Sequence, residues 1–184
     1  MPMEQLRYPI GPFKRQDSLD EQTRFGYIAS LEEAPGRLRE AVAGLSDSEL
    51  DTPYRPEGWT VRQVVHHLAD ADLNGYIRTK QALTEKEPVI APFDEEAWSE
   101  LTDARTAPVA LSLILHDQLH RRWTMLLRAT PAADFARAYR HPANGLWTLD
   151  SALSFFAWHN LHHIAHITSL RERNGWNAER IIGD

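Results

Sequence analysis

Apolar residues recur every three or four positions along most of this chain, a pattern typical of amphipathic α-helices packed around a shared core. The first such stretch covers residues 18–42, and Pro35 inside it predicts either a kink or a junction between two helices. The second covers residues 60–83 and opens with Thr60 and Gln63, which have the spacing of a capping box. Both stretches are long enough to form principal helices of a domain.

Two further stretches have the same period. One covers residues 108–130, with Pro108 near its start; the apolar positions that predict this helix are Leu111, Ile114, Leu115, Leu119, Trp123, Leu126 and Leu127. The last starts at an N-cap, Thr148 or Asp150, and stops near Asn174-Gly175, a common helix C-terminus. The chain therefore contains four amphipathic helices.

The segments between these helices lack helical periodicity. Residues 1–17, with three prolines and a glycine, predict an extended N-terminal arm, and residues 85–98 predict a long connection that ends in a short helical turn. Asn144-Gly145, flanked by aromatic residues, is typical of the turn in a short two-stranded β-ribbon. We expect an all-α fold in a single domain of residues 1–184: a four-helix bundle with one long crossover connection.

Histidines interrupt the apolar face of the fourth helix. The residues of this face follow one another at steps of four, three, four, three and four positions: Ala152, Phe156, His159, His163, His166 and Leu170. Burying an imidazole without a hydrogen-bond partner costs about 1–3 kcal/mol, so three on one core stripe need either polar partners or a metal ion. A metal site is favoured, with ordinary core packing as the alternative.

Spacing alone leaves two candidate ligand pairs, because His159/His163 and His162/His166 both have the i, i+4 separation that places two imidazoles one turn apart. A third ligand has to come from another helix. His67 is the better candidate, since it lies one turn from the core residue Val64, whereas His66 points closer to the polar side.

Composition limits the chemistry. The 184 residues include no cysteine, so a metal site must use His, Asp, Glu or water. A net charge of −6 disfavours a general affinity for nucleic acid. No apolar run is long enough for a membrane span and the N-terminus has no signal-like apolar region, so we expect a cytoplasmic protein without membrane partners.

Other polar residues are weaker candidates. Asp70 or Asp72 could orient an imidazole or act as a general base, although a carboxylate on a helix of this kind is more often solvated. His116 and His120, again an i, i+4 pair, are interpreted mainly as structural. Three arginines could pair with an anionic substrate: Arg62, Arg121 and Arg122. The sequence has no Gly-rich phosphate loop, no GxSxG and no HExxH motif.

Several of these segments together resemble one known family. The two most specific are WTVRQVVHHLAD at residues 59–70 and WHNLHHIAHI at residues 158–167. Shorter ones are YPIG (8–11), LDTPYRPEGW (50–59), YIRTKQALTE (76–85) and RWTMLLR (122–128). With these segments the chain resembles the DinB/YfiT superfamily, and within it the YfiT (BstA) branch, over nearly its whole length.

The resemblance implies a bundle that is often a homodimer and one divalent metal ion per chain, zinc or nickel, held by His67, His159 and His163. His66, His162 and His166 then become neighbours without an assigned role. Three imidazoles leave a coordination position open, as in catalytic zinc sites. The implied activity is that of a metal-dependent hydrolase acting on a small molecule. Two alternatives stay open: an S-transferase for a low-molecular-weight thiol such as bacillithiol, and a non-catalytic metal-binding stress-response module.

Overall fold

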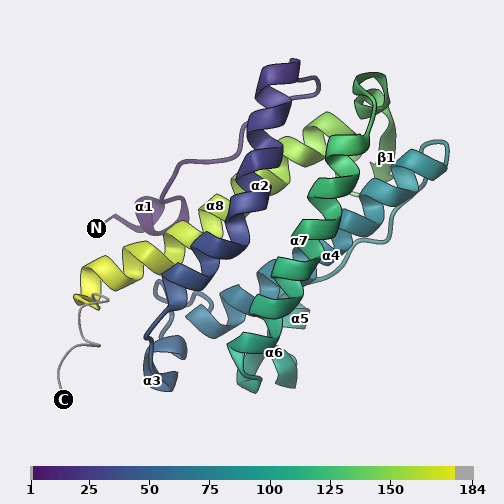
Figure 1. The fold of residues 1–184 in the computed structure, drawn as a ribbon. Helices are drawn as coiled ribbons and strands as arrows, with labels where there is room; N and C mark the ends of the chain where they lie inside the picture. The colour runs from purple at the N-terminus through teal and green to yellow at the C-terminus, as the bar shows by residue number, and fades with distance from the viewer. Residues whose placement is uncertain (1, 177–184) are drawn as a thin grey trace.

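Four long helices form the body of the molecule in the computed structural model, which describes residues 2–176 (Figure 1). They are α2 (Glu21–Val42), α4 (Val61–Thr84), α7 (Val109–Ala129) and α8 (Leu149–Asn174). The predicted four-helix bundle is confirmed. α4 and α7 run in the same direction, because the crossover between them returns the chain to the end of the bundle at which α4 begins (Figure 1).

Local sequence signals explain where the helices begin and end. Thr60 and Gln63 form the capping box at the start of α4, and Thr148 caps α8 by accepting a hydrogen bond from Ser151 N. Gly175 ends α8 with a left-handed φ of 65°, which a residue without a Cβ adopts readily. α2 continues through the buried Pro35 as one helix, so the predicted junction of two helices at this proline is wrong.

Short elements connect the long helices. The crossover contains α5 (Glu95–Ser99) and α6 (Thr102–Thr106), and α3 (Asp47–Leu50) precedes α4. After the 3-10 helix η1 (Ala132–Ala136), strands β1 (Ala138–His141) and β2 (Gly145–Thr148) pair antiparallel, with Tyr139 opposite Trp147. This hairpin is the predicted β-ribbon.

The N-terminal arm differs from its prediction at one point, because α1 (Met3–Arg7) is helical rather than extended. The arm lies along α8 (Figure 1). Trp158 Nε1 donates to Gly11 O over 3.2 Å, and Thr148 Oγ1 donates to Asp17 O over 2.9 Å. The arm thereby covers part of the histidine-rich surface of α8.

α7 buries only part of its apolar stripe. Leu119, Trp123 and Leu127 are buried, whereas Leu111, Ile114 and Leu115 are 62%, 63% and 44% exposed. The buried face also includes His116 and His120, which are fully enclosed. The histidines can be buried because a carboxylate on α4 hydrogen-bonds to both, as described below.

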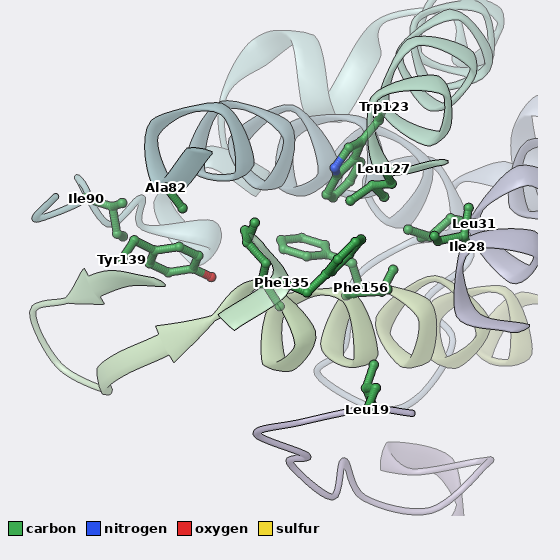
Figure 2. Close-up of a cluster of buried hydrophobic side chains, with 13 residues drawn as sticks. Leu19, Ile28, Leu31, Ala82, Ile90, Trp123, Leu127, Phe135, Tyr139 and Phe156 are labelled. Atoms are coloured by element: carbon green, nitrogen blue, oxygen red, sulfur yellow. The ribbon is translucent and has the colours of Figure 1, made fainter. Parts of the chain in front are cut away.

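The core consists of two apolar clusters with a polar layer between them. One cluster gathers Trp123, Leu127 and Phe156 with residues of α2 and the hairpin (Figure 2). The other lies toward the opposite end of the bundle and consists largely of α4 residues 61–68 and the C-terminal part of α8. Histidines from α4, α7 and α8 occupy the layer between these clusters. In the described part of the chain, no helix is both long and apolar enough to span a membrane.

Candidate metal centre

Three histidines from two helices meet at one wall of a cavity. His67 belongs to α4, whereas His159 and His163 lie one turn apart on α8, and all three are at least 92% buried. One ring nitrogen from each lies within 4.8 Å of the others, and the Nε2 atoms of His67 and His159 are 3.2 Å apart. The structure thus brings together the three residues that the family resemblance implied.

Aromatic side chains hold these rings in place. Trp59, at the start of α4, stacks near His67 and His163, with ring centroids 4.5 and 6.0 Å away. Phe155 stacks against His159 at 5.2 Å. Because these rings are restrained on several sides, the three imidazoles have little rotational freedom left to lose on binding an ion.

Burial keeps the three imidazoles neutral. Desolvation, followed by the neighbouring imidazoles, holds the pKa values of His67 and His163 well below the ordinary histidine value. Desolvation lowers the pKa of His159 to about 4. A neutral imidazole has a lone pair on one ring nitrogen, which is the form that binds a metal.

The donor set fits a divalent ion. Two nitrogens that each bind zinc at about 2.0–2.1 Å in a tetrahedron lie about 3.3 Å apart, close to the 3.2 Å between the Nε2 atoms of His67 and His159. The Nε2 atoms of His67 and His159 face each other, and a cation bound between them would accept a lone pair from each ring.

The three histidines open onto a cavity of about 880 Å³, large enough for a small-molecule substrate. Its walls come from α4, α5, the hairpin and α8, and include the aromatic residues Trp59, Phe93, Trp147, Phe155 and Trp158. Several acidic residues of the lining, such as Glu57, Glu95 and Glu96, are exposed. A ligand can therefore reach the open side of the three-histidine group.

The other candidate pair on α8 makes different contacts. His166 Nε2 donates to Arg7 O over 3.0 Å, and its ring stacks on Tyr54 at 3.9 Å. His162 stacks on Trp158 at 4.4 Å. Both also line the cavity, but neither belongs to the three-histidine group. His66, predicted to point toward the polar side, is buried instead and hydrogen-bonds to Ala107 O and Ser112 Oγ.

A second buried polar group lies on α4 and α7. Asp72 Oδ2 accepts hydrogen bonds from His116 Nε2 at 2.9 Å, His120 Nε2 at 2.6 Å and Asn160 Nδ2 at 2.9 Å. Burial would raise the pKa of Asp72, but the hydrogen bonds and charges of the two histidines hold it well below its usual range. Asp72 therefore orients imidazoles, but those of His116 and His120. It does not line the cavity.

Asp70 also lies outside the cavity lining. Desolvation, followed by the negative charge of Asp103 on α6, raises its pKa to about 6. Asp70 thus has the perturbed pKa of a functional carboxylate without facing the three histidines. Its placement gives no support to a role as general base.

The three arginines proposed to bind an anion lie elsewhere. Arg62 is buried and paired with Asp47 and Asp51, at 2.9 and 2.7 Å. Arg121 pairs with Asp117, and Arg122 lies over the ring of Tyr76. None of them lines the cavity, whereas Arg78 does. Arg78 was not predicted from the sequence because a single arginine on an amphipathic helix usually belongs to a solvated face.

The fold and the three-histidine site define the class of the protein, a four-helix bundle with a candidate metal centre. The chain belongs to the DinB superfamily, whose family model matches residues 30–167. It is 51% identical to "Putative metal-dependent hydrolase YfiT" of Bacillus subtilis, over 94% of this chain and 97% of the relative. A Bacillus licheniformis relative named in the same way is 52% identical, over 95% of this chain and 100% of its own length.

The same likeness holds in three dimensions. The solved structure of YfiT from Bacillus subtilis, described as an unusual four-helix bundle topology, superposes with a TM-score of 0.92 at 51% identity. The match covers 94% of this chain and 99% of the solved one. The present chain therefore has the fold of the solved YfiT structure.

Proposed function

We propose that this protein is a metal-dependent hydrolase with one zinc or nickel ion held by His67, His159 and His163. The observation that supports the proposal most is the convergence of three buried, neutral imidazoles on the wall of an open cavity. The hydrolase names of the relatives agree with it.

An ion bound there supplies Lewis acidity, which lowers the pKa of a coordinated water toward about 7 or holds a coordinated thiol as its thiolate. The chain's own residues hold the ion and surround the substrate. His67, His159 and His163 present neutral nitrogens in a fixed arrangement, and the aromatic walls around them exclude bulk water from one side of the substrate. The open side toward the cavity admits the group to be cleaved.

One observation also favours the thiol S-transferase alternative. The three-histidine group includes no carboxylate, neither Asp70 nor Asp72 lines the cavity, and the carboxylates that do line it, Glu57, Glu95, Glu96 and Glu100, are exposed. Hydrolysis usually uses a general base beside the nucleophile, whereas a thiolate needs no further base. Product analysis with an ester or amide, and separately with a thiol and an electrophile, distinguishes the two reactions.

Metal content tests the site itself. We expect about one zinc or nickel ion per chain in the wild type, and loss of the ion in His67→Ala, His159→Ala and His163→Ala. His162→Ala is the matched control, because this histidine lines the same cavity and adjoins His163 but is outside the three-histidine group. An unchanged metal content in all four variants would place the ion elsewhere, with Asp72, His116 and His120 as the next candidates.

Turnover tests the function. His163→Ala should abolish the activity of the zinc-loaded protein while leaving its helical circular dichroism unchanged. A metal-loaded wild type without turnover of esters, amides or thiol–electrophile pairs would instead support the third alternative, a metal-binding module without catalysis.

A further inference from the structure

Arg78 is a charged group without a charged partner. Within the described residues it forms no ion pair, and its guanidinium makes a single hydrogen bond, from Nη2 to Ala91 O at 3.2 Å. Its Nε is buried with no hydrogen-bond partner, which is true of no other arginine in the described chain. Retaining an unpaired, partly buried guanidinium is unfavourable unless an anion binds to it.

A second unpaired donor belongs to the same cavity lining. The indole Nε1 of Trp147 is buried and has no hydrogen-bond partner. Trp147 stands opposite Tyr139 in the hairpin, and Tyr139 is near enough to Arg78 for the guanidinium charge to lower the phenol's pKa, although burial raises it overall to about 12. Arg78, Tyr139 and Trp147 all line the cavity onto which the three histidines open.

The position of Arg78 relative to His67 sets the length of a ligand that could reach both. The two residues are eleven positions apart on α4, which is close to three full helical turns, so they lie on the same face. Their Cα atoms are about 16 Å apart along the helix axis. A molecule that contacts both residues has to be elongated.

We propose that Arg78 and the indole N–H of Trp147 form a carboxylate-binding subsite, and that the substrate is an elongated molecule with a carboxylate at one end and its reacting group at the three histidines. This inference rests on the proposed function and adds the substrate class. A guanidinium binds a carboxylate through two parallel hydrogen bonds. Arg15 also lies over the ring of Trp147, but it is already paired with Asp17. The single unpaired charge of Arg78 balances one carboxylate, whereas a phosphate dianion would remain negative in a cavity whose lining includes the exposed Glu57, Glu95 and Glu96.

A matched pair of thiols tests the subsite. Mercaptooctanoate and mercaptooctanol have a thiol that can bind the metal and differ at the far end, a carboxylate against a hydroxyl. Titrated calorimetrically into the zinc-loaded wild type, mercaptooctanoate should bind about 10- to 100-fold more tightly, the range for a hydrogen bond to a charged group. Mercaptopropionate, too short to span the cavity, should show no such advantage.

Variants assign this preference to the proposed residues. Arg78→Gln should bind the two octyl thiols equally while keeping its metal content, and Trp147→Phe should lose a few-fold of the preference. Arg55→Gln is the control, because Arg55 lines the same cavity but already donates to Tyr54 Oη and Pro56 O. It should keep the full preference.

Failure of the subsite and failure of the metal site give different results. Cobalt-substituted protein that shows thiolate absorption with both octyl thiols, at equal affinity, retains the metal site and overturns the carboxylate subsite. Protein that binds neither metal nor thiol overturns the proposed function. In that case octanoate and octanol are titrated into the metal-free protein, and equal binding by wild type and Arg78→Gln rejects the subsite.

Discussion

His120 Nε2 lies 2.6 Å from Asp72 Oδ2, while the other ring nitrogen of His120, Nδ1, lies 2.6 Å from the carbonyl oxygen of Leu31. A carbonyl oxygen only accepts, so Nδ1 bears a proton, and a second proton must lie between Nε2 and the carboxylate. The pair is therefore a buried, hydrogen-bonded bridge between α4, α7 and α2. His116 and Asn160 also donate to Asp72 Oδ2.

Replacing Asp72 should strongly destabilise the fold. Asp72→Ala removes the shared acceptor and leaves two buried imidazoles without it, for which we expect a loss of about 3–5 kcal/mol in the free energy of unfolding. The pKa of Asp72 is depressed in the folded state, so its contribution is present above the unfolded value near 4 and is lost only at more acidic pH. Urea unfolding near pH 7 measures the effect, and a loss below about 1 kcal/mol would contradict it.

The carboxylate of Asp70, unlike that of Asp72, should lower the stability of the fold near pH 7. Its folded pKa of about 6 lies above the unfolded value of about 3.9, so between these two values the folded state binds more protons and stability falls as pH rises. Asp70→Asn removes this penalty. We expect it to raise the free energy of unfolding near pH 7 by roughly 1–2 kcal/mol and to have little effect near pH 4. A variant less stable than wild type near pH 7 would mean that the carboxylate has a favourable partner.

Metal binding should resist mild acid. A solvent-exposed histidine becomes protonated near pH 6.5 and then releases a metal, but burial lowers the pKa of His159 to about 4. Zinc affinity should therefore change little between about pH 8 and 6 and weaken steeply only below about pH 5. Equilibrium competition with a chelator across this range measures it. A marked loss of affinity between pH 7 and 6 would indicate ligands that are solvated in the folded protein.

The exposed apolar residues of α7 suggest a contact with a second copy of the chain. Leu111, Ile114 and Met125 of α7 are exposed, Met125 to 72%, as are Leu73 and Ile77 of the adjacent helix α4, and exposed apolar residues on neighbouring helices are typical of an interface between copies. We propose a homodimer through this surface. Ile114→Glu should convert dimer to monomer in sedimentation equilibrium, whereas Val89→Glu, exposed on the crossover, should not. A monomeric wild type would contradict the proposal.

The periodic apolar pattern predicted the four helices because each buries one stripe, and the residues at Thr60, Thr148 and Gly175 predicted their ends because capping is local. The ligand pair His159/His163 was not distinguishable from His162/His166 by spacing, since both pairs share one helical face; the family resemblance supplied the choice. The burial of His116 and His120 was not predictable either. Their burial depends on hydrogen bonds to Asp72 on another helix, and no local sequence pattern predicts that contact.

The position of the three histidines between two apolar clusters has a consequence for how the protein acquires its metal. Packing on either side already fixes α4 against α8, so the ligand arrangement does not depend on an ion for its assembly. We expect the chain to fold without the ion and to bind it afterwards, so that the rate of loading depends on how quickly an ion reaches His67, His159 and His163 through the cavity.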